Sequence, residues 1–409
     1  MNAYSPGQPT SLTFKSSITQ GIKMSIDQPT TRALRMLSVA YFVQAVGALS
    51  VIGSLAPIER EWNLDNTASA YLMTVFGVTF ALAAPLLQVL LGHVRRQRQV
   101  LLGLCVFGLG ALIFAAAPSY TVLVIARVIM GLGAAFIGPV LAALGSSLVS
   151  SERQGSAIAM VLLGLSVAGL VGIPLSSWIA YQVGVRSLFT GIGVTALITA
   201  LLIAWQVPNR TEGQRVAFVT LIRMLTHMHS LSVFGVAFFA TAAVYTTYTF
   251  IAPVVQDVYS GSSDDVSVAL LVLGIAGVLG NLLVTRLAAR YSADRLLITS
   301  MGVLAILMLL LGVGPHALGW FFAALIVWAI ATDVIWPSQQ RRVIEHLAAH
   351  RGAALALTAA FVFCGIGAGA ALAGWAYPAR GFTGLLATSI CLLILASVCL
   401  LISAKTHRR

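Results

Sequence analysis

Long apolar runs alternate with short polar breaks along almost the whole chain. Twelve runs are long enough for membrane-spanning helices, each of which needs about 20 mostly apolar residues. A β-barrel would instead show alternating segments of about 10 residues. The pattern therefore predicts an all-α integral membrane protein with twelve transmembrane helices. The expected spans are residues 34–55, 67–91, 100–117, 119–147, 155–180, 186–206, 231–256, 265–288, 296–313, 317–338, 353–376 and 382–404.

Basic residues mark one side of this predicted bundle. Lysine and arginine are enriched in the cytosolic loops of membrane proteins. Only Arg60, Arg186 and Arg380 fall on the opposite side, and Arg127 falls within a span. We therefore expect an even number of spans and cytosolic termini. The other twenty basic residues are Lys15, Lys23, Arg32, Arg35, Arg95, Arg96, Arg98, Arg153, Arg210, Arg215, Arg223, Arg286, Arg290, Arg295, Arg341, Arg342, Arg351, Lys405, Arg408 and Arg409.

The composition supports a lipid environment. Hydrophobic residues make up 59% of the 409 residues, charged residues 9%, and the mean hydropathy is +0.95. The net charge of +12 resides in loops and tails, with no basic stripe of the kind that binds nucleic acid, so we expect no nucleic-acid partner. The four cysteines lie in apolar runs and predict packing rather than disulfides or metal binding.

The chain divides into two similar halves. We expect a disordered cytosolic tail at 1–32, a six-helix bundle at 33–206, a cytosolic linker at 207–230, a second bundle at 231–404 and a cytosolic tail at 405–409. In both halves a short basic loop precedes a Leu-rich third helix, and an Arg and a Gly lead into the fifth. A repeat of this kind is typical of transporters with a substrate site between the halves, near the bilayer midplane.

Several motifs, each weak alone, occur in an order and spacing that resemble the major facilitator superfamily from residue 34 onward. The resemblance is strongest to its drug:proton antiporter branch, near arabinose-efflux and chloramphenicol-resistance exporters. It implies two pseudo-symmetric six-helix bundles in a bacterial inner membrane, operating as a monomer. The motifs are Gly53-Ser-Leu-Ala-Pro57, Ala126-Arg127-Val-Ile-Met-Gly131, Gly169-Leu-Val-Gly172-Ile-Pro174, Gly184-Val-Arg186, Tyr248-Thr-Phe-Ile-Ala-Pro253, Gly274-Ile-Ala-Gly277 and Trp336-Pro337.

The chain also departs from the pattern of that family. The loop before residue 100 has the basic cluster Arg95, Arg96 and Arg98 but lacks the usual Asp, and the equivalent loop of the second half has Ala289. Leu49 occupies the approximate position of an acidic residue that many relatives carry in the first helix. We therefore expect the interhelical latch of this loop to be weaker or built differently, and proton coupling cannot use that acid.

Two ionisable residues within spans are candidates for function, because charge is costly inside a membrane. Arg127 lies about 12 Å into the fourth span at 1.5 Å per residue. It either senses protons, binds an anionic substrate, or only hydrogen-bonds carbonyls at a helix end. Asp333 lies in the tenth span. It either exchanges protons, since burial raises a carboxyl pKa, or is a structural partner of Arg341 or Arg342.

Other candidate residues are polar or aromatic groups at positions that suit a cavity wall, for which ordinary helix packing is an alternative. The cavity candidates are Gln44, Tyr245, Thr246, Thr247, Tyr248 and Trp336. A second set belongs to the motifs that the family uses for conformational change, for which helix packing is again an alternative. These conformational candidates are Gly169, Gly172, Pro174, Arg95, Arg96 and Arg98.

The sequence lacks a phosphate-binding loop, a metal-spacing cluster and a hydrolytic triad. We therefore expect no metal, no cofactor and no enzymatic activity. The leading interpretation is a secondary transporter that exports a small molecule and uses the proton gradient as its energy source. A proton-coupled nutrient importer and, further away, a non-transporting receptor remain alternatives.

Overall fold

A computed structural model describes residues 28–150, 153–209, 211–213, 217–348 and 351–407. Most of the expected disordered tail, residues 1–27, lies outside these ranges. The first helix begins at Gln28, so residues 28–32, which were assigned to the tail, are helical. Within the described ranges the secondary structure is helical, with no strand.

The N-terminal half contains six spans, two of them interrupted. The first consists of α2 (Gln28–Leu49), a short 3₁₀ turn η1 (Ile52–Ser54) and α3 (Leu55–Trp62), with a bend of 47°. The fifth is divided by the π-helical turn η3. The other elements are α4 (Asn66–Leu91), α5 (Arg96–Ala116), α6 (Tyr120–Ser147), α7 (Gln154–Val167), η3 (Ala168–Gly172), α8 (Ile173–Gln182) and α9 (Val185–Gln206).

A short helix, α10 (Phe218–Thr226), lies within the linker between the halves. The seventh span ends in a π-helical turn, whereas the π turn of the fifth span lies inside it. The elements of the C-terminal half are α11 (Met228–Tyr248), α12 (Ile251–Pro253), the π turn η4 (Val254–Val258), α13 (Ser263–Leu287), α14 (Ala293–Val313), α15 (Leu318–His346) and α16 (Arg351–His407).

The helix α16 supplies the last two spans. Gly381 interrupts it with φ 59° and ψ −147°, a conformation that glycine adopts without steric cost. The chain reverses there, because Ala354 and Ser403, near opposite ends of α16, both lie beside the end of α15. In the described chain ten helices are long and apolar enough to span a membrane, and the bent first pair adds an eleventh. Counting α16 as two passes gives the twelve expected spans.

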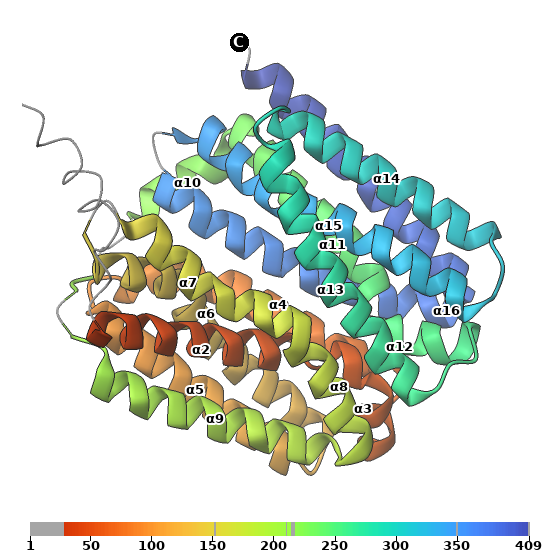
Figure 1. Ribbon diagram of the computed structural model, residues 1–409, viewed down its shortest axis with the longest axis horizontal. Coiled ribbons are helices and arrows are strands. Elements are labelled where there is room, and N and C mark those ends of the chain that lie inside the picture. Colours follow the sequence, from red (N-terminus) through yellow and green to blue (C-terminus); the bar gives the residue numbers. More distant parts are fainter. Residues whose placement is uncertain (1–27, 151–152, 210, 214–216, 349–350, 408–409) are drawn as a thin grey trace, which may run out of the picture.

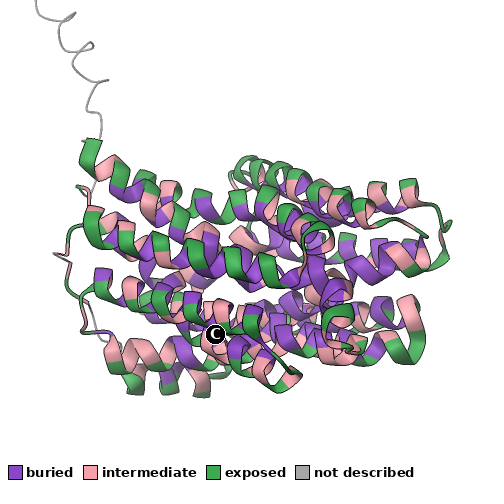
Figure 2. Ribbon diagram, turned by 90° about the horizontal axis from the view of Figure 1, so that it is seen from below, coloured by how far each residue is buried: buried purple, intermediate pink, exposed green. Residues whose placement is uncertain are grey.

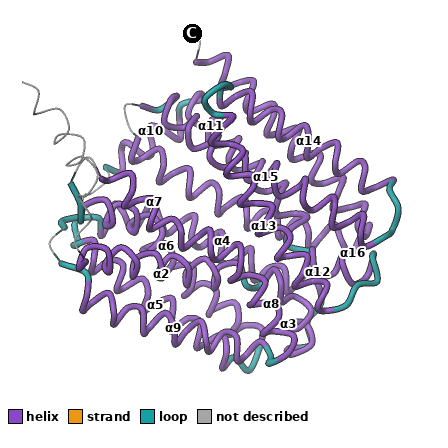
Figure 3. The backbone as a smooth tube through the Cα atoms, in the orientation of Figure 1, coloured by secondary structure: helices purple, strands orange, loops and turns teal. Residues whose placement is uncertain are grey.

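The two halves form separate groups of roughly parallel helices that lie side by side (Figures 1 and 3). We call the end of the bundle that holds α10 the linker side; the first turn of α2 also lies there. The opposite end, with α3 and α12, we call the far side. Many large apolar side chains are exposed, such as those of Leu82, Leu201 and Val313. Figure 2 shows exposed positions along the outer sides of the helices. Such an apolar surface fits lipid rather than water.

Glycines allow the two halves to approach closely. A Cβ at Gly77 of α4 would lie 2.5 Å from the carbonyl oxygen of Phe363 in α16. A Cβ at Gly274 of α13 would lie 2.7 Å from the carbonyl oxygen of Gly169 in η3. These two contacts join the second span to the eleventh and the fifth to the eighth. Backbones that touch in this way are typical of helix packing in membranes.

Candidate transport site

Arg127 lies on α6 and is fully buried. Its guanidinium donates from Nε to the carbonyl oxygen of Leu72 at 3.0 Å, from Nη1 to Gly47 at 3.1 Å and from Nη2 to Ala48 at 3.0 Å. Its Cζ also lies 4.5 Å from the centre of the Phe76 ring. The side chain thus joins the first, second and fourth spans, and it presents no exposed surface to a substrate in this conformation.

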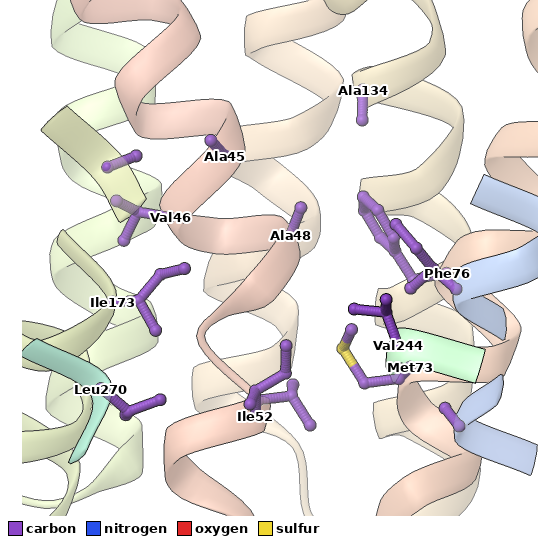
Figure 4. Packing of buried hydrophobic residues seen from close by; sticks show 14 of the residues in the cluster. Ala45, Val46, Ala48, Ile52, Met73, Phe76, Ala134, Ile173, Val244 and Leu270 are labelled. Atoms are coloured by element: carbon purple, nitrogen blue, oxygen red, sulfur yellow. The ribbon is translucent and has the colours of Figure 1, made fainter. Parts of the chain in front are cut away.

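Two of the three carbonyls that Arg127 binds, those of Gly47 and Ala48, lie where the first span breaks. α2 ends at Leu49, so carbonyls of its last turn lack the helical N–H partners that a continuing helix would supply. Figure 4 shows the break between Ala48 and Ile52, with Met73 and Phe76 of α4 facing it. A cation at the carboxyl end of a helix is also favoured by the helix dipole. The end of α2 therefore stabilises the buried charge of Arg127.

Asp333 lies on α15 and is partly buried. Its carboxylate faces α13, because a Cβ at Gly277 would lie 2.5 Å from Oδ2. It also lies within electrostatic range of Tyr245 and Tyr248 on α11. No described residue forms a hydrogen bond or an ion pair with the Asp333 carboxylate. Asp333 is thus an unpaired carboxyl where three helices of the C-terminal half converge.

The two arginines proposed as structural partners of Asp333 bind other groups. Arg341 pairs with Glu345 at 2.7 Å and donates to the carbonyl oxygen of Ala288. Arg342 is fully buried, pairs with Asp294 and bonds Ser403. Both arginines thereby tie the linker-side end of α15 to its neighbours. They leave Asp333 without a cationic partner among the described residues.

The aromatic candidates of the C-terminal half form a chain of ring contacts. The Tyr245 and Tyr248 ring centres lie 5.6 Å apart, and Tyr248 lies 5.6 Å from Trp328. Thr247 and Tyr248 line an apolar recess that also includes Trp328. Trp336 is partly buried against the core. This wall is apolar and aromatic, and Asp333 lies within electrostatic range of its two tyrosines.

Thr246 is placed differently from its neighbours. Its side chain is fully buried and donates to the carbonyl oxygen of Ala242 at 2.7 Å. The hydroxyl also reaches the carbonyl oxygen of Gly369 in α16 at 3.4 Å. Thr246 thus contributes to packing between α11 and α16, and it does not line an open space in this conformation.

The predicted motif of the fifth span forms the π turn. Gly169 and Gly172 belong to η3, and Pro174, which has no backbone N–H to donate, follows in the first turn of α8. Gly172 packs closely on the first span, since a Cβ there would lie 2.4 Å from Val46. The backbone of Gly169 instead meets Gly274 of the other half. The motif therefore lies where the halves touch.

The basic loop between the second and third spans is held by glutamines that our sequence analysis missed. Gln97 donates from Nε2 to the carbonyl oxygens of Ile203 and Val207, at 3.2 and 2.6 Å. Gln99 donates to Leu91, Gly92 and Val94 of the loop itself. Both side chains are buried. Amide donors thus close the loop in which the family usually places an Asp.

The three arginines of this loop differ in the contacts that their side chains make. Arg96 donates to the carbonyl oxygen of Ala143 at 2.8 Å and so reaches the end of α6. Arg95 reaches the carbonyl oxygen of Asn209 at 3.3 Å. Arg98 is exposed and forms no hydrogen bond or ion pair with another described residue. Two of the three predicted arginines therefore bind neighbouring helix ends and the linker.

These features define a multi-pass membrane carrier built from two bundles, with polar groups concentrated at a few points inside. The family model of the Major Facilitator Superfamily matches residues 37–259 and again 233–409. The chain belongs to this superfamily. It is a membrane transporter and not an enzyme, and its substrate is a small molecule that crosses a lipid bilayer.

Two curated relatives are similar over most of their length. The inner membrane transport protein YdhP of Escherichia coli K12 is 29% identical over 328 residues, which cover 79% of this chain and 82% of YdhP. YbcL of Bacillus subtilis, described as an uncharacterized MFS-type transporter, is 26% identical over 313 residues, covering 76% and 80%.

Solved structures share the fold at low sequence identity. A bacterial homologue of the human lysosomal transporter Spinster, in an inward-facing and unoccupied conformation, superposes with a TM-score of 0.74. It is 14% identical, and the match covers 94% of this chain and 98% of that one. The occupied inward-facing form of that homologue gives a TM-score of 0.69.

Proposed function

We propose that the chain is a proton-driven exporter of a small molecule. The observation that carries the proposal is Asp333, an unpaired and partly buried carboxyl inside a span. A carrier driven by protons needs a group that is neutral in one conformation and charged in another. Burial favours the neutral carboxyl, and access to water favours the charged one. Among the described residues Asp333 has no cationic partner that would keep it charged in this conformation.

The helix contacts support alternating access. The halves pack together through α4 with α16, and through α13 with η3 and α8. At the far side, α12 contacts both η1 and α3. α7, the linker-side part of the fifth span, makes no comparable contact with α13. This arrangement supports a far side that is closed and a linker side that opens, as the inward-facing description of the Spinster homologue would suggest.

The membrane orientation follows from the positions of the arginines. The linker side carries Arg95, Arg96, Arg341 and Arg342, and we propose that it faces the bacterial cytosol together with both termini. We further propose a monomer in the inner membrane. A reporter enzyme active only outside the cytosol, fused to the C-terminus, should remain inactive. Activity of that reporter would contradict the orientation.

Export rather than uptake is supported by the resemblance of the fifth span to the antiporter motif. Its Gly169, Gly172 and Pro174 form the turn that meets the other half. A proton-coupled importer is the alternative. A growth screen with deleted and overexpressing strains separates the two. An exporter makes the overexpressing strain more resistant to its substrate, whereas an importer of a toxic compound makes it more sensitive.

The proton coupling is tested with Asp333→Asn in inverted vesicles carrying an imposed pH gradient and the compound identified by the screen. We expect uphill transport to fall at least tenfold, while exchange without a gradient survives. Asp264→Asn is the matched control, because Asp264 is exposed at the start of α13. If Asp333→Asn still concentrates the compound, Asp333 is structural and coupling resides elsewhere.

A further inference from the structure

A polar cavity lies on the linker side of the C-terminal half. It has a volume of about 270 Å³ and is enclosed by α10, the start of α11 and the end of α15. Its polar lining residues are Thr220, Arg223, His227, Ser230 and His346. Among the described residues that line the cavity, none is acidic. The cavity is therefore suited to an anion rather than to a cation.

Arg223 brings a positive charge to this cavity. The residue is exposed, and its guanidinium forms no hydrogen bond or ion pair with another described residue. Its carbonyl oxygen accepts from the Thr226 hydroxyl and from the backbone N–H of His227, which fixes the end of α10. A guanidinium in such a place can donate two parallel N–H bonds to a phosphate.

Ser230 supplies a donor that is buried inside the cavity. Only 7% of the residue is exposed, and its Oγ forms no hydrogen bond with another described residue. Buried hydroxyl groups in folded proteins nearly always have a partner, because leaving one unbonded is costly. The buried Oε1 of Gln44 on α2 also has no partner among the described residues, but an amide oxygen can only accept. The Ser230 hydroxyl can donate to an anion.

The start of α11 adds backbone donors to the same place. The N–H groups in the first turn of a helix have no acceptor within it, and the N-cap His227 forms no hydrogen bond from its side chain. Because both His227 and Ser230 line the cavity, the cavity lies at this amino-terminal end. The helix dipole and the first N–H groups favour phosphate at such an end.

The position of the cavity indicates where the phosphate comes from. α11 is a membrane span, so its start lies at the depth of the lipid headgroups. α10 buries Leu221 and Met224 but leaves Val219 and Ile222 65% and 44% exposed, and Met228 at the start of α11 is 60% exposed. Apolar side chains beside a basic cavity fit a lipid whose headgroup enters the cavity and whose acyl chains remain outside.

We propose that this cavity binds the phosphate group of an anionic phospholipid. Arg223 pairs with the phosphate, and Ser230 and the first turn of α11 donate to its oxygens. The acyl chains lie against Val219 and Met228. This inference goes beyond transport of a substrate, and it rests neither on proton coupling nor on the direction of transport.

Lipid binding to the delipidated full-length protein in a neutral detergent tests the site. Native mass spectrometry measures the affinity, and thermal unfolding measures the stabilisation that binding causes. The three probes are dioleoylphosphatidylglycerol, dioleoylphosphatidylcholine, whose headgroup has no net charge, and glycerol phosphate, which has no acyl chains. We expect the phosphatidylglycerol to bind most tightly and to raise the unfolding temperature most.

Substitutions at Arg223 and Ser230 test the two kinds of contact. We expect Arg223→Glu to weaken phosphatidylglycerol binding about tenfold or more, whereas Arg223→Lys, which keeps the charge, should lose much less. Ser230→Ala should weaken it about fivefold, because a donor to the phosphate is lost. Without lipid this variant should unfold at the native temperature or above it, since the hydroxyl has no partner within the described protein to lose.

Arg290→Glu is the matched control for the change of charge, because Arg290 is exposed on the linker side and does not line the cavity. It should bind phosphatidylglycerol with nearly native affinity. Equal weakening by Arg223→Glu and Arg290→Glu would overturn the site, as would native affinity in both Arg223→Glu and Ser230→Ala. Equal affinity for the two lipids would overturn the preference for an anionic headgroup. Glycerol phosphate that binds as tightly as phosphatidylglycerol would overturn the lipid as the source of the phosphate.

Discussion

A single side chain, Arg127, organises the centre of the N-terminal half. Its burial would be prohibitive for an isolated charge, yet it donates to three carbonyls and to the sulfur of Met73 at 3.5 Å. Our sequence analysis left a role in substrate or proton binding open beside a structural one. In this conformation the contacts are those of a structural clamp on the broken first span. A functional role would require that break to rearrange during transport.

We predict that Arg127→Lys and Arg127→Ala insert into the membrane but lose transport. A lysine ammonium carries its three N–H donors on one nitrogen, so it does not reproduce the spacing of the three guanidinium nitrogens that bond the carbonyls. We expect both variants to unfold at lower temperature and to transport at least tenfold more slowly, with a loss of about 3 kcal/mol for the alanine variant. Fluorescence thermal unfolding and vesicle transport measure the two effects.

The exposed Arg290 on the linker side provides the control variant Arg290→Ala, which should match the native protein in both assays. Native transport by Arg127→Ala would show that the clamp is dispensable. Absence of the Arg127 variants from the membrane would place the role of the residue in insertion instead.

At the scale of single residues, the sequence predicts which charged residues lie inside spans but not which groups they contact. Arg127 and Asp333 stand out because charge is rare in apolar runs. Their surroundings could not be predicted, since the partners of Arg127 are backbone carbonyls and Asp333 faces a glycine. Gln97 was missed because an uncharged amide beside a basic cluster carries little signal.

At the scale of elements, the two halves close corresponding loops with different chemistry. In the N-terminal half the amides of Gln97 and Gln99 bind helix-end carbonyls. In the C-terminal half the corresponding region is held by charge, with Arg342 paired to Asp294 and Arg341 bonded to Ala288. The loop between the second and third spans is therefore held by other contacts than the loop between the eighth and ninth spans. Charge-assisted bonds are the stronger of the two kinds.

The breaks within helices were less predictable than the helices themselves. The twelve spans follow from hydropathy, but hydropathy does not distinguish an α turn from a π turn. The π turns η3 and η4 depend on tertiary contacts, such as the close approach of Gly274 to Gly169. Proline and glycine at 169–174 indicate an irregular helix without specifying its form.

We predict that Gly274→Leu hinders the approach of α13 to the π turn η3. A Cβ there would meet the Gly169 carbonyl oxygen at 2.7 Å and the Leu170 Cα at 2.7 Å, both backbone atoms that cannot turn aside. The halves must then separate at this point, which disfavours the conformation described here. We expect normal membrane insertion and at least tenfold slower transport, measured in vesicles with the compound from the growth screen.

Gly302→Leu is a suitable comparison, since Gly302 on α14 is exposed and has no atom within 4 Å of an added Cβ. It should transport at the native rate. Native transport by Gly274→Leu would mean that the contact between the fifth and eighth spans is not required in the cycle.

At the scale of the molecule, the sequence predicts two bundles but not how they meet. Alternative conformations of a carrier bury similar amounts of the same apolar faces, so hydropathy cannot choose between them. The structure resolves this through bonds between the halves. Thr67 donates to the carbonyl oxygen of Gly374 at 2.8 Å, and Thr74 donates to Gly367 at 2.9 Å. Both bonds lie in the far-side portion of α4.

We predict that locking this far-side contact stops transport. Ala70 of α4 and Gly374 of α16 belong to different halves, and a Cβ at Gly374 would lie 3.1 Å from the Ala70 Cβ. A disulfide requires a Cβ separation of about 3.5–4.5 Å, which a small shift of the helices provides. In a chain whose four native cysteines are replaced, oxidation of Ala70→Cys with Gly374→Cys should abolish transport, and reduction should restore it.

A cross-link within one half is the matched control for this experiment. A Cβ at Gly235 of α11 would lie 3.5 Å from the Cβ of Cys399, and both residues belong to the C-terminal half. Oxidising Gly235→Cys with Cys399 retained should leave transport close to native, because the bundle moves as a unit if the halves rock against each other. Equal inhibition by both cross-links would indicate that the C-terminal bundle itself deforms. Undiminished transport with the Ala70–Gly374 cross-link formed would show that the far side need not open.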